Sequence, residues 1–286
     1  MYYGLNPPWG ESAQTANFWA FTLSHASIFQ IDAAQVWRMR LDMEITELRL
    51  SMRKSLSHSL EIGIELPVVG LHAGFFDGLI DTYHNIFNFG DYGRSQYPRN
   101  EFYYTLTDCG VPIVKIGDGH IGFGDIQLNL KQSITHGKDH LAFRLTCELP
   151  TGNAERGVGN GSFDWGLTFI LETQPREDLT FLVNLGAVFP GDIHGTQNVA
   201  TQPYFMFVLL AECEIGPFFV IHGDVTLLTS PFAQTMLPFF NNHPVMLTLG
   251  LKRTKGKSTI GFSFMEDLNV TGAPDITIQV FYAKKF

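Results

Sequence analysis

The sequence has no run of 18 apolar residues, so it cannot cross a membrane with an α-helix, which needs about 20 consecutive apolar residues. It also has little charge. Asp, Glu, Lys and Arg make up only 16% of its 286 residues, against about a quarter in soluble domains. A membrane β-barrel accounts for both features, because its lipid-facing apolar residues alternate with polar residues of the lumen. The mean hydropathy of +0.05 fits this dilution.

Other absences narrow the possible functions. The net charge is −9 and there is no basic cluster, which argues against nucleic-acid binding. The three cysteines, Cys109, Cys147 and Cys213, are odd in number, and two of them fall on apolar strand faces, so we expect no structural disulfide. No pair among the ten histidines has the helical or Cys-x-x-Cys-type spacing of a zinc site. We therefore expect neither a metal nor a cofactor.

The start of the sequence lacks a targeting signal. Residues 1–10 contain neither the basic region nor the apolar region of a signal peptide. Because a barrel protein must first cross the inner membrane, we expect that the sequence lacks its true N-terminus.

Alternation of apolar and polar residues with period two is the dominant pattern. It is clearest in residues 124–149, where Ile126, Leu128 and Leu130 alternate with polar residues ahead of a tight turn and a second alternating strand. We count twelve such strands, with short turns after the even-numbered strands and longer loops after the odd-numbered ones. This sorting is typical of outer-membrane barrels and has no reason to occur in a soluble β-sandwich or closed barrel, which is the alternative. The predicted fold is all-β, an antiparallel up-and-down transmembrane barrel of about 12 strands that forms a single domain over residues 1–286.

The second predicted strand, residues 37–52, changes phase. Its apolar positions begin with Met39 and Leu41 and continue one residue out of step with Leu48 and Leu50. A β-bulge near Thr46 would explain the shift. The loop before this strand is expected at residues 30–36.

The long connection over residues 67–123 contains a helical pattern. Apolar residues recur at helical spacing over residues 73–89, which predicts an amphipathic helix. Its apolar face comprises Phe75, Phe76, Leu79, Tyr83 and Phe87. The helix could plug the barrel, cover its rim as a lid or lie in the membrane interface, and simple packing against the rim is the plain alternative.

Strand parity selects the residues that face the lumen, where a function would reside. The predicted pore lining includes Asp42, Glu44, Glu61, Glu65, Asp125, Lys131, Arg144, Glu148, Glu212 and Asp224. Because acids outnumber bases, one interpretation is a narrow pore with an acidic lumen that passes small polar solutes. The other is an interlocked salt-bridge network that fills the interior and conducts little, since charges inside a low-dielectric wall must be paired.

Several segments resemble one known family. They are LNPPWG, LEIGIELPVV with the following GFFDGLIDTYHNIF, GDIQLNLK, CELPTGN, and FMEDLNVTGAPDITIQVFY near the end. Together they resemble the uncharacterised bacterial family known as domain of unknown function 3187, over nearly the whole chain. The resemblance implies an outer-membrane barrel of Gram-negative bacteria and implies no activity, so it supplies no catalytic residues.

The sequence therefore predicts a pore or transporter in the bacterial outer membrane. Expected partners are membrane lipid, lipopolysaccharide, a small polar solute and the barrel assembly machinery, whose recognition signal the terminal Phe286 resembles. A lipid-modifying enzyme and a sealed structural or adhesion barrel are the alternatives. His25 and Ser27 share one strand face, as a serine–histidine site would require, but no third residue can be named for a triad.

Overall fold

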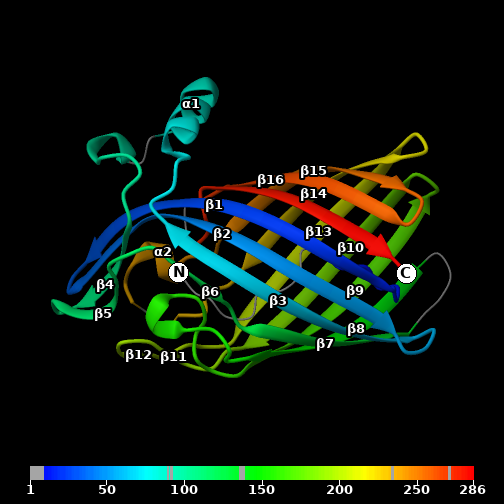
Figure 1. Cartoon of the computed structure of the whole chain (residues 1–286), viewed down its shortest axis with the longest axis horizontal. Coiled ribbons are helices and arrows are strands. Elements are labelled where there is room, and N and C mark those ends of the chain that lie inside the picture. The colour runs from blue at the N-terminus through cyan, green and yellow to red at the C-terminus, as the bar shows by residue number, and fades with distance from the viewer. Residues whose placement is uncertain (1–9, 89, 91–92, 135–138, 233–234, 270–271) are drawn as a thin grey trace.

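The computed structural model describes residues 10–88, 90, 93–134, 139–232, 235–269 and 272–286, except the side chain of Phe87. Twelve antiparallel strands form a closed barrel, which confirms the predicted fold class. In barrel order they are β1 (Phe18–Ala34), β2 (Trp37–Ser55), β3 (Leu60–His72), β7 (Ile126–Ser133), β8 (Asp139–Leu149), β9 (Asp164–Arg176), β10 (Leu179–Phe189), β13 (Tyr204–Ile215), β14 (Phe219–Leu228), β15 (Val245–Lys255), β16 (Ser258–Asp267) and β17 (Ile276–Lys285). Because β1 pairs with both β2 and β17, the barrel wall has no free edge (Figure 1).

The two ends of the barrel differ in their connections. At the end where β1 begins and β17 finishes, strands join through short turns such as 177–178, 216–218 and 256–257. At the other end lie the long connections 73–125, 150–163, 190–203 and 229–244. Outer-membrane barrels turn their short connections to the periplasm, so we call the long-loop end extracellular.

Short elements occupy the extracellular connections. They are α1 (Asp77–Phe87), β4 (Tyr103–Asp108), β5 (Val111–Ile116), β6 (His120–Phe123), β11 (Ile193–His194), β12 (Asn198–Val199), α2 (Pro238–Asn241) and two 3-10 turns at Arg94–Gln96 and Ala154–Arg156. Among the described residues, no helix is long and apolar enough to cross a membrane.

The β1–β2 hairpin is longer than predicted. Residues 30–34, expected in a loop, belong to β1, and only Gln35 and Val36 form the turn. The strands can continue past the barrel wall because β4 pairs with β2 over Trp37–Asp42 and satisfies its backbone hydrogen bonds. The predicted loop at 30–36 is therefore wrong.

The predicted β-bulge near Thr46 is also wrong. The pairing of β1 with β2 runs without a register shift from Phe18 and Arg53 to Ala34 and Trp37. The alternation of inner and outer side chains in β2 is unbroken, and what changes along the strand is the environment of each face. Near the periplasm the outer face carries Leu48 towards lipid, whereas near the hairpin tip the inner face carries Met43 into an apolar cluster.

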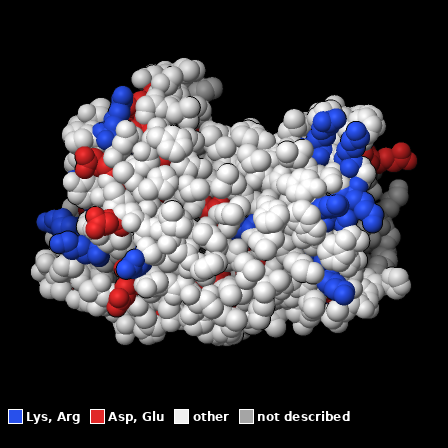
Figure 2. Space-filling view, viewed as in Figure 1, with Lys and Arg blue, Asp and Glu red and all other residues white. Residues whose placement is uncertain are grey.

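The middle of the outer wall is apolar. Figure 2 shows few Lys, Arg, Asp or Glu residues over the middle of this face, and the charged residues gather at both ends. Outward-pointing side chains exposed in this band include Leu145, Leu167, Leu209, Leu249 and Phe262. Such a band between two polar ends matches the hydrocarbon layer of a bilayer.

Candidate functional site

The lumen is occupied by residues that precede β1 in the chain. Residues 10–17, which we call the plug segment, enter from the periplasmic end, where Asn17 Oδ1 accepts a hydrogen bond from Ser55 N at 3.0 Å. Further in, Ala16 N donates to Glu61 Oε2 at 2.6 Å. Ser12 Oγ donates to Glu172 Oε2 at 2.6 Å, and Ala13 N donates to the same oxygen at 3.0 Å.

Glu11 is the main charged contact of the plug segment. Its carboxylate pairs with Arg144, lies 3.2 Å from Lys131 Nζ and lies 3.8 Å from Arg53 Nη1. Its backbone N–H also donates to Asn184 Oδ1 on β10 at 2.6 Å. The segment thus joins β2, β7, β8 and β10 across the interior through one residue.

The lumen wall around the plug segment is a connected ion-pair network. Glu65 binds Arg53 at 2.6 Å and Arg49 at 2.9 Å, and lies 3.5 Å from Arg144. Arg144 has no exposed surface, and its guanidinium also donates to Asn129 Oδ1. These residues lie on the inner faces of β2, β3, β7 and β8, as strand parity predicted for Glu65 and Arg144.

The charges of this network balance. Four basic residues face four carboxylates, and these are Arg49, Arg53, Lys131 and Arg144 against Glu11, Glu47, Glu61 and Glu65. The wall contributes only three of these carboxylates, and Glu11 of the plug segment supplies the fourth. This side of the lumen therefore matches the interlocked network that the sequence left open.

Four other predicted lumen residues lie on inner faces with different contacts. Asp125 accepts backbone hydrogen bonds from Gly152 at 2.7 Å and Asn160 at 3.1 Å, so it anchors the loop between β8 and β9. Glu148 accepts a hydrogen bond from Gln127 at 2.8 Å. The remaining pair, Glu212 and Asp224, lies across the lumen, where Glu212 pairs with Lys252 and Asp224 bonds Thr226 at 3.2 Å.

A polar cavity remains beside the plug segment. It has a volume of about 150 Å³ and lies against β13–β17, with Gly10 of the plug segment on one side. Its lining includes His222, Asp224, Thr248 and Lys252. Both signs of charge and several hydroxyl groups therefore border the free part of the lumen.

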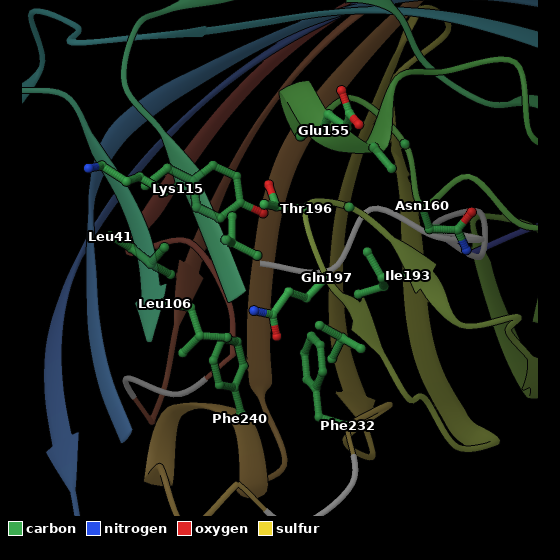
Figure 3. Close-up of a pocket in the computed structure, with 17 residues that line it drawn as sticks. Leu41, Leu106, Lys115, Glu155, Asn160, Ile193, Thr196, Gln197, Phe232 and Phe240 are labelled. Atoms are coloured by element: carbon green, nitrogen blue, oxygen red, sulfur yellow. The ribbon is translucent and has the colours of Figure 1, made fainter. Parts of the chain in front are cut away.

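Apolar residues pack at the extracellular end of the lumen. Val158, Leu237, Phe239 and Phe240, which we call the extracellular cap, pack on the inner-face side chains of β2 and β3. A cavity of only about 40 Å³ lies among the extracellular connections. Figure 3 shows Gln197, Phe232 and Phe240 converging on one side of it.

Two predicted lumen residues lie outside the barrel. Asp42 and Glu44 are on the outer face of β2, in step with Leu48, so their assignment to the lumen is wrong. The error follows from the bulge prediction, which reversed the parity of the first half of this strand. Glu44 instead bonds His25 Nε2 at 2.7 Å on the neighbouring strand.

The segment that leads into α1 packs over this outer-face position. Glu44 Oε1 accepts hydrogen bonds from the backbone N–H groups of Phe75, at 2.8 Å, and Phe76. Gly74 has a φ of +81°, and a Cβ there would overlap the Glu44 carboxylate. The sequence therefore needs glycine at this position for the chain to approach the wall so closely.

Helix α1 is shorter than predicted and lies outside the barrel. It spans Asp77–Phe87 instead of residues 73–89, so Phe75 and Phe76 precede it. Tyr83 packs against Phe264 on β16, with ring centroids 5.6 Å apart. Of the predicted helix residues, Phe75, Leu79 and Tyr83 are placed on the outer side, and the side chain of Phe87 lies outside the described residues.

A buried arginine fastens α1 to the rim. Arg94, which is 6% exposed, pairs with Asp77 at the start of α1 and with Asp275 before β17 at 2.7 Å. Its guanidinium also lies 4.9 Å from the centre of the Phe29 ring. The helix therefore does not plug the lumen, and it projects sideways from the wall at the extracellular end (Figure 1).

The side chains of His25, Glu44 and His72, which we call the outer-face cluster, do not form a serine–histidine site with Ser27. His25 and Ser27 do share one face of β1, as predicted. Both ring nitrogens of His25 are already engaged, Nδ1 with Thr46 Oγ1 at 2.8 Å and Nε2 with Glu44. Ser27 is also only 1% exposed. A general base needs a free nitrogen next to an accessible nucleophile, so this geometry does not favour the enzyme hypothesis.

Comparison with known proteins assigns the chain to a family. The family model described as protein of unknown function, DUF3187, matches residues 10–286. The chain belongs to this family. The resemblance seen in the sequence is thereby confirmed, and a search of curated proteins finds no match.

Two solved structures with a similar fold are an outer membrane channel and a porin. The COG4313 outer membrane channel from Pseudomonas putida F1 is similar over 99% of this chain and 100% of that chain, with 13% identity and a TM-score of 0.67. The KdgM porin in complex with disordered oligogalacturonate is similar over 94% of this chain and 99% of that chain, with 5% identity and a TM-score of 0.50. Together with the closed barrel and its apolar outer band, this likeness confirms the predicted location, the bacterial outer membrane.

Proposed function

We propose that this DUF3187 protein is a gated channel for small polar solutes and that the plug segment is its gate. The supporting observation is how the segment is held. Its contacts with the wall are mainly hydrogen bonds and ion pairs, from Ser12, Gln14 and Glu11 to Glu172, Arg144 and Asn184. Water that enters the lumen can hydrogen-bond to these polar partners, so the segment can leave the lumen without exposing a large apolar surface.

The proposed path runs along the wall of β13–β17. The polar cavity of about 150 Å³ already lies there, and displacing the plug segment would extend it towards Glu172 and Asn184. Because Lys252 and His222 border the cavity together with Asp224, we propose selection by size and hydrogen bonding instead of a strong cation preference. The fold shared with an outer membrane channel and a porin supports a channel as the class of function.

Solute uptake by liposomes tests this proposal. The refolded protein is reconstituted and swelling is followed with neutral polar solutes of increasing size. We expect uptake of the smallest solutes and exclusion of the largest, because the free part of the lumen is narrow. If neither the wild-type protein nor a variant that lacks residues 1–16 admits any solute, the barrel is a sealed structure and the proposal fails.

We further propose that α1 lies in the outer-leaflet interface. Leu79 and Ile86 are 53% and 71% exposed and continue the exposed side of Phe75 along one helix face. Such a stripe on a helix beside the lipid-facing wall is suited to the boundary between acyl chains and head groups. Membrane lipid, lipopolysaccharide and the barrel assembly machinery remain the proposed partners.

Spin labels on α1 measure its depth. A nitroxide is attached to Ile86→Cys or to Asn85→Cys as the matched control, with Cys109, Cys147 and Cys213 changed to Ser. Because Ile86 continues the apolar stripe and Asn85 does not, we expect oxygen to relax the label at 86 more strongly than a water-soluble nickel chelate does. We expect the reverse at position 85. Equal exposure of both labels to the nickel chelate would place the helix in water.

A further inference from the structure

We propose that His25, Glu44 and His72 form a binding site for one divalent transition-metal ion of the zinc class on the outer face of the barrel. The three residues come from β1, β2 and β3. The strand register sets Glu44 opposite both Ser27 and His72, and it sets His25 opposite Thr46, so all three side chains point outwards at one place. One ligand atom from each residue lies within 4.8 Å of the other two.

The donor set suits such an ion. Two imidazoles and one carboxylate are protein ligands that zinc binds in tetrahedral sites with one open position. The 2.7 Å contact between His25 Nε2 and Glu44 Oε2 is the hydrogen bond that an ion would replace. Metal–nitrogen and metal–oxygen bonds of about 2.0–2.2 Å require these two atoms to separate only slightly. Hard cations such as Mg²⁺ prefer oxygen ligands, so the set discriminates against them.

Hydrogen bonds already orient the proposed ligands. Thr46 Oγ1 lies 2.8 Å from His25 Nδ1 and 2.9 Å from His72 Nε2, so one hydroxyl holds both imidazoles. The other carboxylate oxygen of Glu44 accepts the backbone N–H groups of Phe75 and Phe76. Partners of this kind behind the ligands fix ring orientation and tune affinity in metal sites.

Aromatic rings shield the cluster from water. The Phe75 ring stacks on His25 with centroids 5.0 Å apart and an interplanar angle of 24°, and the Phe76 ring meets the imidazole edge-on at 4.3 Å. Glu44 is 1% exposed. A buried carboxylate in such surroundings gains from a cation, and the half-buried imidazoles leave an approach for an ion.

Metal binding would couple the wall to α1. Because Glu44 bonds both His25 and the chain that enters α1, an ion bound to its carboxylate would link β1, β2 and β3 to the start of that helix. This role is independent of the lumen and of the proposed gate.

Titration with Co²⁺ and Zn²⁺ tests the site on the tag-free refolded protein. We expect one Co²⁺ per chain, with the intense visible absorption of a tetrahedral complex, and its displacement by Zn²⁺. The variants His25→Ala and His72→Ala should each bind at least about 100-fold more weakly, because each loses a ligand. His58→Ala, in an exposed turn at the periplasmic end, is the matched control and should bind like the wild-type protein.

A cysteine variant separates a ligand from a structural residue. His72→Cys should restore tight binding and add the thiolate-to-cobalt charge-transfer band, which arises only if residue 72 binds the ion directly. Heat-modifiable migration on a gel verifies that each variant is folded. The proposal is overturned if the folded wild-type protein binds no ion, or if stoichiometric binding survives unchanged in His72→Ala.

Discussion

Deleting residues 1–16 is expected to raise single-channel conductance on the order of tenfold, because the polar lumen then holds water instead of the plug segment. The wall that the deletion uncovers is already hydrophilic, since Glu172, Asn184 and Lys131 now serve as partners of the segment. Planar bilayers that contain the refolded variant provide the measurement. A milder variant, Glu11→Gln, keeps the segment but weakens its hold on Arg144, so we expect more frequent openings of unchanged size.

A matched variant on the outer wall controls for general loosening of the barrel. Leu249→Ala removes an exposed lipid-facing side chain and should leave the conductance unchanged. If the deletion conducts no better than the wild-type protein while the gel shows a folded barrel, another obstruction closes the lumen. The extracellular cap would then be the next segment to remove.

The second large effect is expected on stability. Glu65→Gln should lower the free energy of unfolding by about 3–5 kcal/mol, the usual result of removing one member of a buried charge network. The substitution keeps the shape of the side chain but leaves the guanidinium groups of Arg49, Arg53 and Arg144 with one fewer carboxylate. Denaturant unfolding in detergent micelles, followed by tryptophan fluorescence, gives the change.

Glu148→Gln is the control for this experiment. Glu148 is equally buried on the same lumen wall, at 2% exposed against 4% for Glu65. Its carboxylate accepts a hydrogen bond from the neutral Gln127 and not from a guanidinium. We expect a loss below about 1 kcal/mol, since a neutral hydrogen bond contributes little net stability. Equal losses in both variants would mean that burial, and not ion pairing, makes Glu65 important.

The barrel could be predicted because its signal is local. Period-two alternation in segments such as Ile126–Ser133 and Tyr204–Ile215 fixes which side chains face lipid. The separation of short turns from long loops then tells which end of the barrel faces the periplasm. The family resemblance agreed with this pattern but was not needed to reach it.

The phase of β2 shows where alternation fails. Parity tells which residues share a face, but it does not tell what covers that face. In β2 the apolar residues change from the outer to the inner face because Phe75 and Phe76 cover one side and the extracellular cap the other. Phe75, Phe76 and the extracellular cap are distant from β2 in the sequence. A bulge was therefore the simpler interpretation, and it was wrong.

The plug segment and the outer-face cluster escaped prediction for the same reason. Glu11 contacts Asn184 across 173 residues, and the segment has no periodicity of its own. His25, Glu44 and His72 belong to three strands, so no short spacing marks them. One signal was present in the sequence, since His25 follows Phe21 and Leu23 on the outer face of β1.

A reversible covalent lock gives the most direct test of the gate. The Ser133 hydroxyl donates to the Ala13 carbonyl, so Ala13→Cys with Ser133→Cys, on a background with the native cysteines changed to Ser, places two thiols where the plug segment meets β7. With the disulfide formed, we expect silent bilayers, and a reductant should restore openings within the same membrane. The single variant Ala13→Cys should not respond to the reductant. Identical currents before and after reduction, with the bond verified by mass spectrometry, would contradict the claim that the plug segment gates the lumen.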